Sequence, residues 1–420
     1  MLLTPVHASS NLNQKPLLIA NKTQPMTATQ IFNKAVNAWA LDLYQDLARV
    51  RNLHDKNFVF FTPNLLASFS MLYAGAPERL QGIMEQALHM GELKQNAWHD
   101  NFKVWSEGIR TRSQLLKEGK PIFHFQQVQM LASHVHTPLT EKAANSLSHY
   151  KCENTSFLKA AEVGPFINNR VEEVTEGIIK DLITQDDLTS DLVLMASAAL
   201  FKGQWEYPFD KQENSVETFT NSDGSQVKVE MMNQEVDNLK MAFDATDSYD
   251  ISLLELPFHG QISLLLMKPN SWMKIKAKDQ LQKFMTTETI QELLNSFDKR
   301  FDTASALTVG IPKLDLKEKV DVLAELEHTS LAQAIKAADF NGSLVNGGDV
   351  VKTPKLVSEV HFTMDEEGAK VAGASYSPTY FESCDPEFKL NEPFGFAIID
   401  HNTQTILSMG QVLKLEGLSK

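Results

Sequence analysis

The chain has 420 residues, of which 43% are hydrophobic and 22% charged, a composition typical of a globular protein with a large apolar core and not of a disordered one. The formal net charge of -14 disfavours nucleic acid or an anionic membrane surface as the main partner, because both repel an acidic protein. No apolar run approaches the roughly 18 residues that span a bilayer. The two cysteines, Cys152 and Cys384, are too few for a disulfide framework or a zinc knuckle.

The first part of the chain is predicted to be a tail. Residues 1–26 are polar and lack a hydrophobic period, so we expect them to be disordered or flexible. Val6-His7-Ala8 resembles the end of a signal peptide, but the apolar region before it is too short. We therefore expect the tail to have no targeting role; the alternative is a signal whose start lies upstream. No composition break interrupts residues 27–415, which predicts one α+β domain over residues 27–420.

The first elements after the tail are helix, strand and helix. Thr27 and Gln30 form a capping-box pattern ahead of apolar residues at spacings of three and four, which predicts an amphipathic helix. FVFF at residues 58–61 predicts a short buried strand. Pro63 suits the first turn of a second helix that runs to about Tyr73.

The middle of the chain alternates between helix and strand. A helix is expected from about residue 78 to near Gly91. Residues 123–131 and 192–201 are apolar for most of their length, which indicates strands buried on both faces. The sequence between them predicts a helix that ends at Gly177.

The second half of the chain indicates hairpins. Residues 217–269 are read as strands, with turns at residues 222–224 and 258–260. A helix is expected from about residue 280 to 297. Residues 394–412 are predicted to close the chain as a very apolar hairpin.

Motifs for common enzyme chemistry are absent from the sequence. It has no G-x-S-x-G, no P-loop, no G-x-G-x-x-G and no H-E-x-x-H, so hydrolase, nucleotide-binding and zincin functions lack their geometry. His134 and His136 would share one face of a strand and could chelate a metal. Because no carboxylate or cysteine lies near them, we interpret them as surface histidines.

Two further features have competing interpretations. A basic run of Arg110, Arg112, Lys117 and Lys120 could bind a sulfated polysaccharide. Because Glu107 and Glu118 interrupt the run, we favour a solvated helix face. Trp205 could stack on a ligand, yet it directly follows a buried strand, which favours core packing.

The stretch at residues 364–388 has small and polar residues without a helical period. From Ala369 onward, alternate residues are mostly small, whereas the intervening set includes Lys370, Tyr376 and Tyr380. In an extended chain these two sets face opposite ways, so the small face could lie close over a core. The alternative is a flexible linker, but a linker needs no such asymmetry between faces.

With these residues in view, the chain resembles the serpin family over residues 27–415. Seven motifs occur in the family's order, and together they make a chance match implausible. They are NFVFFTPNLLASFSMLYAGA, INNRVEEVTEGIIKDLI, LMASAALFKGQWEYPFD, VKVEMM, LLELPFHGQISLLLMKP, DEEGAKVAGAS and FKLNEPFGFAIIDHNTQTILSMGQV.

The resemblance implies a fold and a mechanism. The expected fold is α+β with about nine helices, three β-sheets and an exposed reactive-centre loop at about residues 368–388. A protease would cleave this loop, which then inserts as a new strand in the large sheet and traps the protease. The expected partner is therefore a target protease, either a serine or a papain-like cysteine protease. No cofactor or metal is implied, and we expect a monomer that is extracellular or secreted.

The family's usual loop spacing predicts the cleaved bond. Counting about fourteen residues after Gly368 and about eleven before Pro393 selects Glu382-Ser383 from both directions. The alternative is that the bond slips by a residue and Glu382 is a solvated charge. A glutamate before the bond suits a glutamyl-specific serine protease.

Residues around this bond are expected to contact the protease. Phe381, one residue before Glu382, suits a papain-like cysteine protease as the alternative target, since the second pocket dominates the selectivity of such enzymes. Tyr380 and Cys384 complete the expected recognition set, and Cys384 is interpreted as an exposed thiol and not as a nucleophile. The hinge that begins insertion is expected at Glu366, Glu367, Gly368, Ala369, Val371, Ala372, Gly373, Ala374 and Ser375.

Several positions depart from the family pattern. Where the family usually has two serines, an asparagine and a histidine that control sheet opening, this chain is predicted to have Thr62, Leu65, Ser197 and Ser358. The polar network there should be thinner, and Trp205 is expected beside it.

Two loop residues and one helix residue also depart from the family pattern. Val371 is bulkier than the usual alanine, Pro378 would remove a ladder hydrogen bond, and Arg170 stands where the family carries tryptophan. These departures keep an alternative open, a non-inhibitory serpin that acts as a binding or chaperone module. A third class, an enzyme that uses His134, His136 or Cys384, lacks a supporting constellation.

Overall fold

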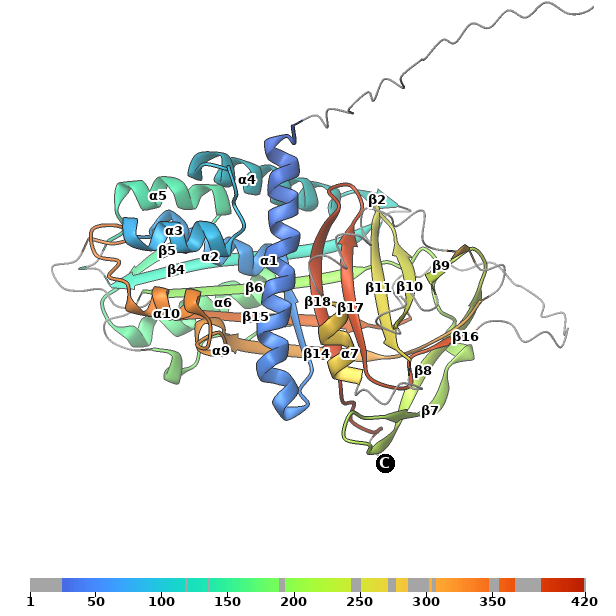
Figure 1. The fold of residues 1–420 in the computed structure, drawn as a ribbon. Helices are drawn as coiled ribbons and strands as arrows, with labels where there is room; N and C mark the ends of the chain where they lie inside the picture. The colour runs from blue at the N-terminus through green and yellow to red at the C-terminus, as the bar shows by residue number, and fades with distance from the viewer. Residues whose placement is uncertain are drawn as a thin grey trace, which may run out of the picture.

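The computed structural model describes residues 25–117, 120–134, 136, 138–188, 193–242, 251–270, 277–285, 302–303, 307–346, 355–366 and 387–418. Nearly all of the predicted tail, residues 1–24, lies outside this range. Within the described residues, nine α-helices accompany sheets of five, seven and four strands and a two-stranded hairpin. The predicted α+β class with three main sheets is confirmed (Figure 1).

The strands of the five-stranded sheet run along the long axis of the molecule (Figure 1). Its strand order is β14-β15-β6-β4-β5, in which β15 pairs with β6 in parallel and β6 pairs with β4 antiparallel. The bounds are Leu314–Asp321 for β14, Lys355–Met364 for β15, Leu194–Gly203 for β6, Phe123–His134 for β4 and Glu153–Phe157 for β5.

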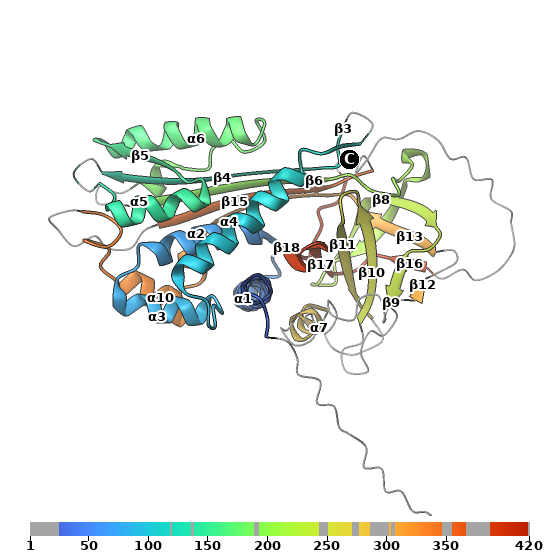
Figure 2. The ribbon, with the colours of Figure 1, turned by 90° about the horizontal axis from the view of Figure 1, so that it is seen from above.

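Helices cover both faces of this sheet, as Figure 2 shows. Helix α6, Val163–Val174, lies over one face and packs on β4. Helix α2, Thr62–Ala74, lies against the other face and contacts β4 and β6. Around α2 lie α3, Glu78–Ala87, α4, Gln95–Arg112, and α5, Glu141–Leu147. The central strands β6 and β15 are therefore buried on both sides, whereas the edge strands β14 and β5 alternate between buried and exposed residues.

The seven-stranded sheet forms the other half of the molecule, with α1, Ala28–Arg51, and α7, Ala277–Phe284, packed on it (Figure 1). Its order is β1-β18-β17-β11-β10-β9-β12. The bounds are Phe58–Phe61 for β1, Thr405–Val412 for β18, Phe394–Asp400 for β17, Ile262–Pro269 for β11, Ile251–Phe258 for β10, Lys240–Ala242 for β9 and Asp302–Thr303 for β12.

The smaller elements complete the described fold. The four-stranded sheet has the order β16-β13-β8-β7, with β16 at Glu387–Lys389, β13 at Leu307–Pro312, β8 at Gln226–Val236 and β7 at Ser215–Thr220. The two-stranded hairpin is β2, Leu116–Lys117, with β3, Lys120–Pro121. Short helices α9, Val322–Glu325, and α10, Ser330–Ala337, lie between β14 and β15 in the chain. Among the described residues, no helix is long and apolar enough to cross a membrane.

The local predictions are largely confirmed. The Thr27–Gln30 capping box is present, FVFF forms β1, and Pro63 lies in the first turn of α2. The turn between β7 and β8 contains Gly224 with φ of +84°, a left-handed conformation that suits glycine. The closing hairpin is β17 and β18.

Several predicted boundaries were wrong. Helix α6 ends at Val174, because Glu176 and Gly177 adopt left-handed φ values of +55° and +79° and Gly177 closes the turn by donating its N–H to Glu172 O at 2.7 Å. Helix α3 ends at Ala87, before Gly91. Helix α7, Ala277–Phe284, begins earlier than predicted, and the end predicted near residue 297 falls among residues 286–301, outside the described part.

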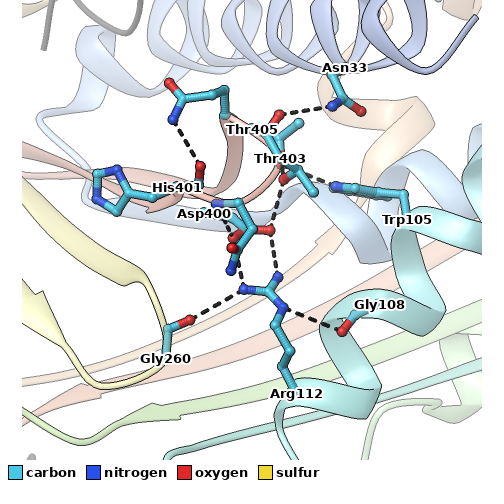
Figure 3. A network of polar contacts seen from close by, with 11 residues as sticks. Asn33, Trp105, Gly108, Arg112, Gly260, Asp400, His401, Thr403 and Thr405 are labelled. Atoms are coloured by element: carbon cyan, nitrogen blue, oxygen red, sulfur yellow. Dashed lines mark hydrogen bonds and ion pairs between the residues drawn. The ribbon is translucent and has the colours of Figure 1, made fainter.

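The interpretation of Arg112 as part of a solvated helix face was also wrong (Figure 3). Its guanidinium donates from Nη1 and Nη2 to Asp400 at 2.9 and 2.6 Å, and Asp400 is fully buried. Nη1 also donates to Gly260 O at 3.3 Å, and Thr403 Oγ1 donates to Asp400. This bidentate pair ties the end of α4 to the turn of the closing hairpin.

Candidate functional site

The boundary between β6 and β15, which we call the seam, lies inside the five-stranded sheet. The two strands are paired in parallel from Lys355 opposite Leu194 to Phe362 opposite Phe201. The chain that leaves the end of β15 would run antiparallel to both strands if it turned back between them. A strand in that position could form antiparallel ladders on both of its edges. The topology therefore permits an additional strand at this seam.

A row of polar side chains crosses the sheet at the middle of the seam. Ser358 of β15 lies opposite Ser197 of β6, and Ser197 lies opposite Gln129 of β4. All three are buried. Buried polar groups need hydrogen-bond partners, so these side chains require partners from the elements packed beneath the sheet.

Helix α2 supplies hydrogen-bond partners for Ser358 and Gln129. Asn64 Nδ2 donates to Ser358 Oγ at 3.1 Å, while Gln129 Nε2 donates to Asn64 Oδ1 at 2.9 Å and to Asn64 O at 2.8 Å. Ser68 Oγ donates to Gln129 Oε1 at 3.1 Å. Asn64 thus links β4 to β15 from beneath β6. Separating β15 from β6 must break the Asn64–Ser358 hydrogen bond or the bonds to Gln129.

The predicted sheet-opening residues all lie here, but only one takes part in this network. Ser358 accepts the bond from Asn64. Leu65 is a core residue, and Thr62 and Ser197 are fully buried with hydroxyl oxygens that have no hydrogen-bond partner among the described residues.

Sequence reasoning missed the residues that form most of the network. The polar set is not thinned as expected but is supplied largely by Asn64, Ser68 and Gln129. The available signal was the pair Asn64 and Ser68, which share one face of a helix that is otherwise mainly apolar and entirely buried.

Trp205 lies at the end of the seam nearest the predicted loop. Its ring stacks on Phe258 with centroids 4.3 Å apart, and its Nε1 donates to Asp365 O at 2.9 Å. The residue is buried, so it packs in the core and also holds the backbone that follows β15. A cleft of about 450 Å³ opens beside it, lined in part by Lys202, Gly203 and Thr363.

Glu366, the first predicted hinge residue, is held by charge at the same end. Its carboxylate lies 2.7 Å from Lys313 Nζ and accepts a hydrogen bond from Asn214 Nδ2, and only 3% of its side chain is exposed. Burial by itself raises the pKa of Glu366, but the bonds from Lys313 and Asn214 outweigh it and lower the pKa. Lys313 also lies 2.7 Å from Glu230.

Most of the predicted loop lies outside the described residues. This applies to the reactive bond at Glu382 and Ser383, to the recognition residues Tyr380, Phe381 and Cys384, and to the hinge residues after Glu366, namely Glu367, Gly368, Ala369, Val371, Ala372, Gly373, Ala374 and Ser375. The structure does describe where the loop leaves and returns. It leaves after β15 at Glu366 and returns at β16, which pairs in parallel with β13.

Other groups give no sign of metal or thiol chemistry in the part of the chain that is described. No group of three or more His, Cys, Asp or Glu side chains in that part could hold a metal ion. Burial raises the pKa of the Cys152 thiol to about 12, so this side chain is a weak nucleophile at neutral pH.

A family model described as "Serpin (serine protease inhibitor)" matches residues 34–415. The chain belongs to the serpin family. It is 26% identical over 392 residues to alpha-1-antiproteinase S of Cavia porcellus. The alignment covers 92% of this chain and 91% of that protein. It is 25% identical over 391 residues to an uncharacterized serpin-like protein of Methanosarcina acetivorans, covering 90% of this chain and 86% of that protein.

Solved serpin structures share the fold. Human glycosylated kallistatin superposes with a TM-score of 0.76 at 20% identity, covering 93% of this chain and 99% of that chain. Uncleaved ovalbumin superposes with a TM-score of 0.75 at 19% identity, covering 90% of this chain and all of the other. The predicted family and fold are therefore confirmed.

Proposed function

We propose that this serpin inhibits a protease by the suicide-substrate mechanism, with its loop inserting at the seam between β6 and β15. Membership of a family described as serine protease inhibitors supports protease inhibition in general. The observation that carries the proposal for this chain is the parallel pairing of β6 with β15, directly followed by the chain that would insert.

The energetics of insertion favour an irreversible trap. About ten inserted residues, at about 1 kcal/mol net per hydrogen bond, contribute on the order of 10 kcal/mol. This is similar to the whole stability of a typical domain. The uncleaved form is then metastable, and the small face that begins at Ala369 would pack beneath the sheet.

The proposed reactive bond is Glu382-Ser383. A glutamyl-specific serine protease with a basic pocket would accept Glu382, whereas a papain-like cysteine protease would accept Phe381 in its second pocket. Tyr380 and Cys384 would flank the bond. We further propose that residues 27–420 form one domain and that the protein acts as an extracellular monomer.

A non-inhibitory role is the second candidate, a serpin that acts as a binding or chaperone module. It is favoured by Val371 and Pro378, which hinder deep insertion, and by the Asn64–Ser358 bond, which ties the seam closed from beneath. Under this alternative the loop is a simple substrate and cleavage does not lead to a trapped protease.

The test is to incubate the protein with a glutamyl endopeptidase and, separately, with a cathepsin-like cysteine protease. Inhibition predicts an adduct with one of them that survives denaturing electrophoresis, and mass spectrometry of the adduct locates the bond. A Glu382→Ala variant should lose the adduct with the glutamyl enzyme only. Cleavage of the loop by both enzymes without any adduct would contradict inhibition and favour the second candidate.

A further inference from the structure

Residues 163–188, which we call the α6 strap, cover the outer face of the five-stranded sheet (Figure 2). The strap consists of α6, the segment after it and the short 3-10 turn Gln185–Asp187. Asn168 joins its two halves, because its Nδ2 donates to Ile183 O and its Oδ1 accepts from Ile183 N, both at 2.8 Å. These two hydrogen bonds tie the two halves of the strap together.

The apolar contacts of the strap lie almost entirely on one side of the seam. Its buried side chains pack in a cluster with residues of β4, β5 and β6, and β15 contributes Val357 alone to that cluster. The strand residues on the first side are Val128, Met130, Ala132, Phe157, Leu194, Ala196 and Ala198, and the strap residues are Val163, Ile167, Val171, Ile179, Leu182 and Ile183.

Two polar anchors hold the strap to the same side. Arg170 donates from Nε to both carboxylate oxygens of Glu153 on β5, at 2.8 and 2.9 Å. Glu176 lies 3.1 Å from His124 Nε2 on β4 and 3.4 Å from Lys202 Nζ on β6. Arg170, which replaces the family's usual tryptophan, is thus part of an electrostatic anchor to the edge strand.

Among the described residues, the polar contacts of the strap with the other side of the seam centre on the Asp187 carboxylate, with one longer bond of 3.5 Å from Lys355 Nζ to Asp186 O. Asp187 Oδ1 lies 2.8 Å from Lys355 Nζ of β15, and Asp187 Oδ2 lies 3.1 Å from Lys319 Nζ of β14. Thr184 holds this carboxylate in place through a capping box, donating its N–H and its hydroxyl to Oδ2 at 2.9 and 2.8 Å. The carboxylate is mostly buried, with 12% of its side chain exposed.

An inserting strand would strain this arrangement. A new strand needs about 4.8 Å of extra separation between β6 and β15. As β6 and β15 separate, the strap cannot stay in contact with both strands. Its apolar contacts lie with β4 and β6. The ion pairs of Asp187 must therefore break.

We propose that Asp187, Lys319 and Lys355 form an ionic latch that holds the far end of the seam closed and limits how deeply a strand inserts. Lys355 lies opposite Leu194 at the first pair of the β15–β6 register, far from the loop exit at Glu366. Insertion that begins beside Glu366 reaches the latch last. This inference rests on the proposed insertion mechanism, but it concerns the depth and rate of insertion and not the target protease.

The test measures insertion directly, with a synthetic peptide that has the sequence of residues 368–381, GAKVAGASYSPTYF. Uptake of the peptide is followed over time as the appearance of a more heat-stable species in thermal unfolding. Asp187→Asn keeps an oxygen that can accept the Thr184 bonds but removes the charge. We expect this variant to take up the peptide about tenfold faster than the wild type, equivalent to about 1.4 kcal/mol.

Matched variants separate the latch from a general charge effect. Asp186→Asn makes the same change one residue away, where the side chain is exposed, and should leave the rate unchanged. Lys319→Met leaves Asp187 and its capping box intact, so it keeps the test valid if Asp187→Asn folds poorly. It should also accelerate uptake. Raising the salt from about 0.05 M to about 0.5 M should accelerate the wild type more than Asp187→Asn.

The outcomes distinguish failure of the latch from failure of the proposed inhibition. Equal uptake rates in the wild type, Asp187→Asn and Lys319→Met would overturn the latch, even if the protein forms adducts with a protease. Equal acceleration by Asp186→Asn would also overturn it, because charge alone would then suffice. If none of these proteins takes up the peptide, both the latch and the insertion mechanism fail. Faster uptake in the two latch variants without any protease adduct would leave the latch standing and contradict inhibition alone.

Discussion

Asn64 of α2 donates a hydrogen bond to Ser358 of β15 at 3.1 Å while it accepts one from Gln129 of β4 at 2.9 Å. One side chain beneath the sheet therefore joins strands on both sides of the seam. We expect Asn64→Ala to lower the free energy of unfolding of the native form by about 1 to 3 kcal/mol, because it leaves buried partners unsatisfied. It should also accelerate uptake of the loop peptide.

A second buried residue on α2 provides the control for Asn64. Ser70 accepts a hydrogen bond from Trp98 Nε1 at 2.9 Å, away from the sheet. Ser70→Ala should also lower the free energy of unfolding but should leave the rate of peptide uptake unchanged. If both variants accelerate uptake equally, Asn64 acts only through general stability and not on the seam.

The pair Glu366 and Lys313 is expected to hold the start of the loop. Glu366→Lys would place two cations together at a site where the wild-type carboxylate is buried, so we expect a loss of about 3 kcal/mol in the free energy of unfolding. Lys313→Glu should be similarly destabilising. The double variant should recover a large part of the loss, measured by urea unfolding, and strictly additive losses would argue against a direct pairing.

Arg112 is expected to be essential for the stability of the closing hairpin. Arg112→Ala would leave the fully buried carboxylate of Asp400 without its cation, at a cost of about 3 kcal/mol or more. Arg110→Ala, two residues earlier on the exposed side of α4, should change the free energy of unfolding by less than about 0.5 kcal/mol. Similar effects of the two substitutions in urea unfolding would contradict this role of Arg112.

Stability should fall in mild acid because of His99. This side chain is buried beside Tyr150, and burial lowers its pKa to about 4, with His149 and Lys142 adding to the shift and Asp100 opposing it. In the unfolded chain a histidine has a pKa of about 6.5, so between pH 6.5 and 4 the unfolded state binds the extra proton. Neutral His99 therefore adds stability that is complete above pH 6.5 and is lost as pH falls toward 4.

Urea unfolding at a series of pH values tests this prediction. The wild type should lose about 2 to 3 kcal/mol from this residue alone between pH 7 and pH 4, since one unit of pKa shift corresponds to about 1.4 kcal/mol. His99→Gln, which can still bond Tyr150 but does not titrate, should show a correspondingly smaller decrease. His89→Gln, at an exposed position, is the control. The same pH dependence in all three proteins would contradict the assignment.

Local sequence patterns predicted the elements, because they depend on neighbours in the chain. The capping box at Thr27, the proline that opens α2 and the glycine turn at Gly224 all have causes within a few residues. The predicted ends of the helices were less accurate. Helix α6 ends earlier than Gly177 because Glu176 already adopts a left-handed conformation, with φ of +55°.

The site was predicted only in part, because its contacts join residues that are remote in the chain. Asn64 and Ser358 are 294 positions apart, and Arg112 and Asp400 are 288 apart. Neither pair has a local signal, since each depends on the register of strands from different parts of the chain. The family resemblance located Ser358, Ser197 and Thr62 but not the partners that α2 and β4 supply.

The central claim, that the loop inserts at the seam between β6 and β15, is tested most directly by thermal unfolding before and after the loop is cut. Limited proteolysis should nick the loop within residues 380–386, with mass spectrometry to locate the cut. Insertion worth on the order of 10 kcal/mol, at about 2 °C per kcal/mol for a large domain, predicts that Tm rises by about 20 °C. An unchanged or lower Tm after complete cleavage would contradict the account.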